Sequence, residues 1–388
     1  MTDPIPGRDA AEPPSRPLRL LLLSPPAEMP GGVAEYVGMI LHRLSPAVAG
    51  ERFAIGRRAG EGRHSAWRML CDYFRFVVRL LGRSRPDVLH VNPTLDGYAL
   101  PRDALFLTLA RLRRPRVVVV TFHGWRQGTE RRLLAKGVTG AVLRAGLKFA
   151  LRGATRVLVL AEPYRQTLLR IGLEPERVET GSTMFDGRLF EDSPPAGSAA
   201  GDGSRRRILF LSRFVAGKGG AELIQAFGGL HDAFPDLRLT MAGDGPLALA
   251  WRELAAASPA AAAIDFPGYV SGTAKARLLQ EALLFVLPSA TEGMPVSLLE
   301  AMAAGAVPLV TPVGGIPLVV QPGDSGAFLA SADPAGIAEG LRDMLASRDA
   351  LAGMGRAAAT LAWQRYESAR VVARLERLYL DLAAAPGR

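Results

Sequence analysis

The feature that most constrains the fold is a repeated alternation of short apolar runs with segments of helical length. In the first half, LRLLLLS, DVLHV, RVVVVTF and RVLVLA each have the length of a buried strand. The alternation restarts later with RILFLS, LRLTMAG, AIDFPG, LLFVLPS and AVPLVTP. Strands that alternate with helices form parallel sheets covered on both faces. The sequence therefore predicts an α/β protein of two Rossmann-like, doubly wound domains.

A stretch rich in Pro, Gly, Ala and Ser separates the two halves and predicts a linker at 191–205. We expect an N-terminal domain at 17–190 and a C-terminal domain at 206–366, with a last helix at about 367–385 that packs back on the first domain. Residues 1–16 are polar and Pro-rich and lack the pattern of a secretory signal, so they are predicted to be a disordered tail.

Composition limits the classes of protein that remain. With 388 residues, 48% of them apolar, the chain can bury more than one core. No run approaches the ~18 apolar residues of a membrane span. The single cysteine, Cys71, can form neither an internal disulfide nor a metal site alone, which favours a reducing cytoplasm.

Charge is distributed unevenly along the chain. Residues 1–190 hold 30 Lys and Arg against 17 Asp and Glu, a net charge of +13, whereas residues 191–388 have a net charge of −3. This asymmetry indicates an anionic partner on the first half, unless the Arg content reflects composition alone. Nucleic acid is the less favoured partner because the basic half contains no recognisable reading motif.

Two cations flank a glycine-containing turn in LSRFVAGKGG, just before a predicted helix. Arg213 and Lys218 beside a helix N-terminus would favour a phosphate dianion. The loop matches neither of the common glycine-rich phosphate-binding motifs. The alternative is an exposed loop with two solvated cations.

The segment PSATEGMPVSLLEAMAAG contains two acids that could bind a ligand. Glu292 precedes a predicted helix that begins near Pro295 and ends near Gly305, and Glu300 borders its apolar stripe. A carboxylate in that position needs hydrogen-bond donors, for which sugar hydroxyls are suited. The alternative is a half-exposed surface glutamate.

A further pair of glycines, Gly314 and Gly315 in TPVGGIP, would let backbone approach a ligand closely at the same sheet edge. Ligands of doubly wound sheets bind beyond the carboxyl ends of the strands. The expected site is therefore the cleft between the two domains.

With these residues the chain resembles the retaining GT-B glycosyltransferases of family 4. The resemblance lies in the order of Arg213, Lys218, AGDGPL, GYV, the E-x7-E pair with its EGMP, and the later GG. It covers about residues 17–385 and is strongest at 207–329. The implied fold is GT-B, with two Rossmann-like domains facing a central cleft.

The resemblance also implies residue roles in the second domain. Arg213 and Lys218 would bind the donor diphosphate, Glu300 the ribose hydroxyls and Glu292 the transferred sugar. The remaining donor contacts would come from loop residues, namely Gly293, Met294, Pro295, Gly314 and Gly315 around sugar and phosphate, and Tyr269 and Val270 near the base.

In the first domain, the resemblance assigns Gly31 and Gly32 to a glycine loop near the donor phosphates and acceptor, and His123 of TFHG to a strand-end histidine. Read without the resemblance, the glycines are an ordinary turn and the histidine is structural. Two departures concern donor sugar and acceptor: Leu318 stands where the family often has an acid, and residues 181–187 read GSTMFDG where it often has NGVD.

The implied activity is transfer of a sugar from a nucleoside diphosphate donor to a hydroxyl acceptor with retention, in bacterial-type polysaccharide or glycolipid assembly. Neither a cofactor nor a metal is expected, because the cations neutralise the diphosphate and no ligand spacing is present. The alternatives are a catalytically silent sugar-nucleotide-binding module and another GT-B enzyme, such as an epimerase or a phosphorylase.

The basic first half suggests one more partner. In ERRLLAKGVTGAVLRAGLKFALR, the cations Arg144, Lys148 and Arg152 share a helical face beside Val138, Val142 and Phe149. Together with SAWRMLCDYFRFVVRLLGR at 65–83, these residues predict peripheral attachment to the anionic cytoplasmic membrane face and an acceptor that is lipid-linked or otherwise membrane-borne. The alternative is a domain helix packed only on its own sheet.

Overall fold

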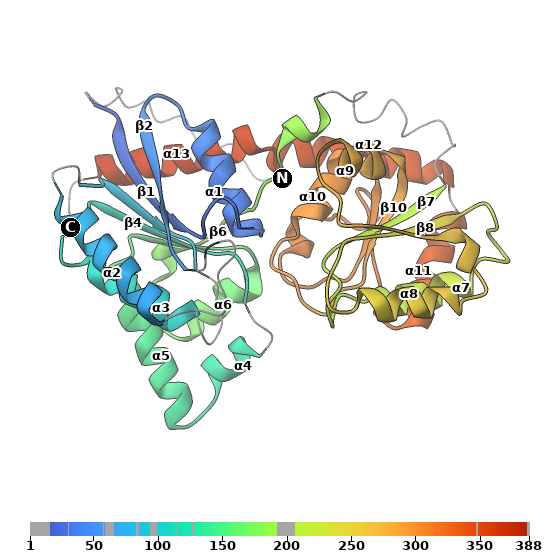
Figure 1. Cartoon of the computed structure of the whole chain (residues 1–388), viewed down its shortest axis with the longest axis horizontal. Coiled ribbons are helices and arrows are strands. Elements are labelled where there is room, and N and C mark those ends of the chain that lie inside the picture. Colours follow the sequence, from blue (N-terminus) through green and yellow to red (C-terminus); the bar gives the residue numbers. More distant parts are fainter. Residues whose placement is uncertain are drawn as a thin grey trace.

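The computed structural model describes residues 16–29, 31–56, 58, 66–82, 85–93, 99–113, 115–125, 128–191, 206–346 and 348–385. Within that part, the chain forms two six-stranded parallel sheets with flanking helices (Figure 1). Apart from Arg16 and Glu191, the predicted tail and linker lie outside the described residues.

The first sheet has the order β2-β1-β3-β4-β5-β6. Its strands are β1 Leu18–Ser24, β2 Val48–Ala54, β3 Val88–Val91, β4 Val117–Phe122, β5 Arg156–Val159 and β6 Val178–Thr180. The helices of this half are α1 Gly32–Arg43, α2 Ala66–Leu81, α3 Ala99–Ala110, α4 Thr129–Leu134, α5 Val138–Leu151, α6 Glu162–Arg170, and the 3-10 turns Pro175–Arg177 and Gly187–Phe190.

The second sheet has the order β12-β11-β10-β7-β8-β9. Its strands are β7 Arg207–Leu211, β8 Arg238–Ala242, β9 Ile264–Gly268, β10 Ala282–Leu287, β11 Val307–Val310 and β12 Ala327–Phe328. The helices are α7 Gly220–Gly228, α8 Ala248–Ala256, α9 Gly272–Glu281, α10 Val296–Ala303, α11 Pro334–Ala346, α12 Arg348–Arg365, α13 Ser368–Ala384, and the 3-10 turns Ala261–Ala263 and Ile316–Leu318.

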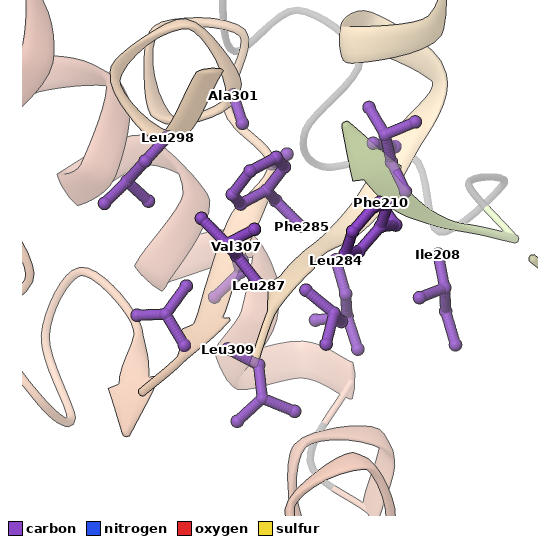
Figure 2. Packing of buried hydrophobic residues seen from close by; sticks show 14 of the residues in the cluster. Ile208, Phe210, Leu284, Phe285, Leu287, Leu298, Ala301, Val307 and Leu309 are labelled. Carbon is purple, nitrogen blue, oxygen red and sulfur yellow. The ribbon is translucent and has the colours of Figure 1, made fainter. Parts of the chain in front are cut away.

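All nine apolar runs are strands, which confirms the predicted α/β class with two doubly wound sheets. Central strands are apolar throughout because helices bury both of their faces. Figure 2 shows this packing in the second domain, where Phe285 and Leu287 of β10 lie close to Leu298 and Ala301 of α10. The three unpredicted strands, β2, β6 and β12, are all at sheet edges and are short or mixed in polarity.

The last helix returns to the first sheet. Val371, Val372, Leu375 and Tyr379 of α13 are buried in the same cluster as Leu20 and Leu22 of β1. Figure 1 shows α13 running alongside the first sheet after the chain has left the second domain. The core of the first sheet is therefore built from both ends of the chain.

A histidine network fixes α13 in place. His90 of β3 shares a hydrogen bond of 2.7 Å through Nδ1 with the Tyr379 hydroxyl and another of 2.7 Å through Nε2 with Thr121 Oγ1 of β4. Burial lowers the pKa of His90 to about 3. The imidazole is therefore neutral at pH 7 and serves as a buried link between sheet and helix.

The stretch at 130–152 that the sequence presents as helical consists of two helices, α4 and α5, with a break at residues 135–137. Gly137 takes a φ of 105°, which side chains rarely adopt, and it caps the start of α5. Gly146 lies inside α5 and the helix continues through it, while a Cβ added at this position would meet only open space.

Candidate active site at the domain interface

Glu300 is buried in α10, not half-exposed as a surface glutamate would be. Pro295, predicted in the first turn, is instead the N-cap, so the helix begins one residue later at Val296; Gly305 follows its end with a φ of 79°. Residues 298–303 are all buried, because the helix lies between β10, β11 and α12. The Glu300 residue is only 5% exposed. A carboxylate at this depth requires specific donors.

One donor is Lys275 of α9, whose Nζ lies 2.6 Å from Glu300 Oε1. The other oxygen, Oε2, is buried and accepts no hydrogen bond from the part of the chain that the structure describes. Burial raises the pKa of Glu300 and the Lys275 charge lowers it, while the acids Glu35 and Asp186 raise it further. The site thus holds a half-satisfied carboxylate suited to a hydroxyl donor.

The first acid is also paired with a lysine. Lys218 Nζ lies 2.5 Å from Glu292 Oε1, and both side chains are mostly buried. The lysine loop is held against the strand that leads to Glu292, since Ala290 N donates to the Gly217 carbonyl at 2.8 Å. The structure therefore brings together two residues that the sequence places on separate loops.

Arg213 lies at the carboxyl end of β7 and is exposed, with no partner among the described residues. Its loop packs on the AGDGPL loop, because Phe214 N donates to the Asp244 carbonyl at 2.8 Å. A Cβ at Gly243 or Gly245 would strike the backbone of Ser212 or Phe214. The guanidinium is thus presented from a tightly packed pair of loops.

The two domains touch through the E-x7-E loop. The Tyr164 hydroxyl of α6 donates to the Glu292 carbonyl at 2.8 Å, and a Cβ at Gly293 would strike the His123 carbonyl. Gly315 N donates to the Gly293 carbonyl at 2.5 Å, and Gly315 also abuts the Leu160 carbonyl. Larger residues at Gly293 or Gly315 would separate the domains, so both glycines are needed for close approach.

His123 is oriented by its neighbours. Its Nε2 lies 2.9 Å from Asn92 Oδ1, and Asn92 Nδ2 donates to the Leu23 carbonyl at 3.3 Å, which fixes the amide orientation. His123 therefore carries its proton on Nε2, leaving Nδ1 as an acceptor. Burial lowers its pKa to about 4, so the ring is neutral at pH 7. The Tyr36 and His123 rings pack in a T-shaped arrangement, with 4.5 Å between their centroids.

The remaining predicted residues surround this centre with fewer contacts. Gly31 caps α1 and Gly32 is its first residue, and Glu35 in the first turn of this helix raises the pKa of Glu300. Tyr269 follows β9 and is 71% exposed, and Val270 is half-buried beside it. Within the described part of the chain, none of these four residues forms a hydrogen bond with either acid.

A pocket of about 630 Å³ lies between the first sheet, α13 and the second domain. Buried Met294 and exposed Leu318 line it from the second domain, and Tyr36 and Thr121 line it from the first. Gly314 packs on the carbonyl of Glu292, in the loop that precedes α10.

Among the described residues, no three His, Cys, Asp or Glu side chains are grouped as metal ligands would be.

Sequence reasoning missed Lys275, Asn92 and Tyr164. Asn92 could have been found, since it follows the run DVLHV at a strand end, just as His123 follows the next run. Lys275 and Tyr164 lie within helices, and only the packing of those helices reveals their partners.

Two sequence families match the chain. The model of the family described as glycosyl transferase 4-like domain matches residues 26–180, and that of glycosyl transferases group 1 matches residues 198–360. The D-inositol 3-phosphate glycosyltransferase of Streptomyces avermitilis is 34% identical over 339 residues, covering 81% of this chain and 70% of the relative. The chain belongs to the group 1 glycosyl transferases, family 4. The N-acetyl-alpha-D-glucosaminyl L-malate synthase of Bacillus anthracis is 25% identical over 310 residues, covering 79% of this chain and 77% of that protein.

Solved structures of the same architecture extend this result to the fold. HepE of Anabaena, in complex with UDP and glucose, superposes with a TM-score of 0.70 over 94% of this chain and 100% of its own, at 17% identity. Sucrose-phosphate synthase of Thermosynechococcus elongatus gives a TM-score of 0.71 over 95% and 100%, at 18% identity. The predicted GT-B fold of this group 1 glycosyl transferase is thereby confirmed.

Proposed function

We propose that this glycosyltransferase moves a sugar from a nucleoside diphosphate sugar to a hydroxyl acceptor, with retention of anomeric configuration. The observation that carries the proposal is the pair of buried lysine–glutamate contacts on one loop and helix, Lys218–Glu292 and Lys275–Glu300. Glu292 is held where the two domains meet, and Glu300 keeps one buried oxygen for a ligand hydroxyl.

The leaving diphosphate gains negative charge as the anomeric bond breaks, so fixed cations lower the barrier. Exposed Arg213 and the first turn of α7 supply positive potential at the carboxyl end of β7. Lys218 lies between this loop and Glu292. Lys218 would contact both the diphosphate and Glu292, the carboxylate proposed to bind the transferred sugar. The proposed reaction requires neither a metal nor a cofactor.

The nucleoside would lie beside Glu300 in α10, farther along the chain than the sugar site at Glu292. Glu300 would accept hydrogen bonds from the ribose hydroxyls, and the base would lie against Tyr269 and Val270. The backbone of Gly293, Met294 and Pro295, with Gly314 and Gly315, would surround the sugar and phosphates. Support for this donor class comes from HepE, whose structures contain UDP, glucose and UDP-glucose.

The acceptor would enter from the first domain, past Gly31 and Gly32. His123, with an unprotonated Nδ1 and a neutral ring, would orient the acceptor hydroxyl or the sugar. We propose a glycan or glycolipid acceptor, lipid-linked at the cytoplasmic membrane face. Family members act on varied acceptors, since relatives are named for inositol 3-phosphate and L-malate.

The proposal is tested by a donor screen with UDP-, GDP- and ADP-sugars, in which thermal shift reports binding and hydrolysis reports turnover. The anomeric configuration of the product, read by NMR, decides between retention and inversion. Binding without turnover for any acceptor would indicate a silent module instead. Isomerised donor, or a sugar 1-phosphate formed from glycan and phosphate, would indicate an epimerase or a phosphorylase.

A further inference from the structure

Exposed apolar side chains are concentrated on one face of the first domain. Thirteen large apolar residues are exposed in the described part of the chain, and ten of these lie on or directly after three helices, α2, α3 and α5. They are Trp67, Leu70, Phe74, Val78, Leu81, Leu105, Leu112, Val138, Val142 and Phe149. We call these ten residues the apolar face.

The longest part of the apolar face is a stripe on α2. Its five exposed residues recur every three or four positions from Trp67 to Leu81, which places them on one side of the helix. The opposite side holds Phe76 and Leu80, which are fully buried against the sheet. Trp67 is 73% exposed and Phe74 is 71% exposed, so the helix is apolar on its inner and outer sides alike.

The three helices form one surface. α3 packs against α2 on one side and α5 on the other, and Figure 1 shows the three side by side on the first domain. Exposed apolar side chains gathered on neighbouring helices in this way mark an interaction site in a folded protein.

The exposed charges of the three helices themselves all have one sign, although the exposed Glu174 lies in the loop beside Lys148 and Arg152. The carboxylates of α2, α3 and α5 are Asp72 and Asp103, which are 2% and 1% exposed and are paired with arginines. Arg75 has half of its side chain exposed, and Lys148 and Arg152 are exposed at the end of α5. The three helices therefore present cations but no exposed carboxylate.

The structure changes the roles of two of the predicted cations. Arg144 donates to the carbonyls of Leu133 and Ala135, each at 2.8 Å, so it closes the turn between α4 and α5. Arg79 pairs with Glu51 of the edge strand β2. The cations of α5 that can face a partner are Lys148 and Arg152.

We propose that the apolar face docks on an anionic lipid bilayer, with the aromatic side chains of α2 in the acyl boundary and the cations at the headgroups. Tryptophan and phenylalanine flanked by arginine and lysine suit that boundary. A second copy of the chain fits poorly, because two such faces would bring like charges together. No described helix has the length and apolar content to cross a bilayer.

The proposal concerns attachment and does not depend on the proposed chemistry. The full chain is incubated with vesicles of phosphatidylcholine alone or with about one third phosphatidylglycerol, then sedimented at low and high salt. We expect sedimentation with the anionic vesicles and release by salt, since surface charges are screened over about 10 Å at 0.1 M. Wild-type protein that stays in the supernatant in every condition would overturn the proposal.

Variants assign the binding to this face. Trp67→Ala with Phe74→Ala is expected to reduce vesicle partitioning at least tenfold, and Lys148→Gln with Arg152→Gln to remove most of the salt dependence. The matched controls are Leu249→Ala and Arg356→Gln, which change exposed residues of the second domain and α12. Equal loss in test and control variants would contradict the assignment.

A spectroscopic readout excludes a protein partner or non-specific pelleting. Trp67 is exposed, whereas Trp125 and Trp251 are buried and Trp363 is half-buried. Lipids brominated on the acyl chain should quench the fluorescence of the wild type but not of Trp67→Phe, which keeps an apolar ring. Binding without quenching in the wild type would mean that α2 does not enter the bilayer.

Discussion

Lys275 and Glu300 form an ion pair of 2.6 Å that joins α9 to α10 and leaves the second carboxylate oxygen buried without a partner in the described structure. The pair sets the charge of the proposed ribose-binding group. Burial and the acids Glu35 and Asp186 raise the pKa of Glu300, and only Lys275 opposes them. Lys275 is therefore expected to act as a positioning residue for nucleotide binding.

Replacement of Lys275 by Met should make nucleotide affinity dependent on pH. Without the lysine, the pKa of Glu300 rises further, and the protonated acid accepts fewer hydrogen bonds. We expect nucleoside diphosphate affinity of the variant to fall roughly tenfold from pH 8 to pH 6, or about 1.4 kcal/mol, with little change in the wild type. Calorimetry at several pH values measures this, and Lys275→Arg should restore the flat profile. Parallel profiles in wild type and Lys275→Met would refute the role.

The two acids should fail differently. Glu300→Ala is expected to weaken binding of the free diphosphate, because a ribose contact is made in the ground state and transition state alike. Glu292→Ala is expected to reduce kcat more than that affinity, since its proposed partner is the transferred sugar. Calorimetry and steady-state kinetics separate the two effects, and unchanged affinity in Glu300→Ala would count against the ribose contact.

Loss of either cation at the proposed diphosphate site should reduce kcat/KM. Arg213→Ala and Lys218→Ala are each expected to cost roughly 2–4 kcal/mol of transition-state stabilisation. Arg213→Ala should leave thermal stability unchanged because its side chain has no partner in the described structure. Arg356→Ala on α12 serves as the control for general charge loss. Near-normal turnover in the double variant would eliminate this site.

Acid should destabilise the fold through its buried histidines. The pKa of His90 is about 3 and that of His123 about 4 in the fold, against about 6.5 when exposed. The unfolded chain therefore binds protons first. The stability that the two neutral histidines contribute is complete above pH 6.5 and is lost as pH falls, down to about 4 for His123 and about 3 for His90. Each histidine contributes a slope of up to about 1.4 kcal/mol per pH unit in that window.

The comparison for that prediction is His90→Gln, which should be less stable than the wild type at pH 8 because the Tyr379 and Thr121 contacts change. Its free energy of unfolding, measured by urea denaturation, should nevertheless fall less steeply between pH 6.5 and 4.5. An equal slope in both proteins would show that His90 is not the group that titrates.

Periodicity and spacing predicted the central strands and the loops that carry the acids, because buried parallel strands are apolar throughout. Edge strands such as β2 carry polar residues on their solvated positions and do not show this signature. The partner of Glu300 could not be predicted, since Lys275 is 25 residues away and meets it only where α9 crosses α10. The contact of Gly293 with the His123 carbonyl likewise depends on how the domains face each other.

The return of α13 to the first sheet affects the order in which the protein can mature during synthesis. Multidomain chains commonly complete the N-terminal domain first as they leave the ribosome. Here the sheet face that carries Leu20 and Leu22 stays uncovered until Val371–Tyr379 has emerged. The domain that is translated first is thus finished last, after the whole second domain has been made, and its uncovered face must avoid aggregation throughout that interval.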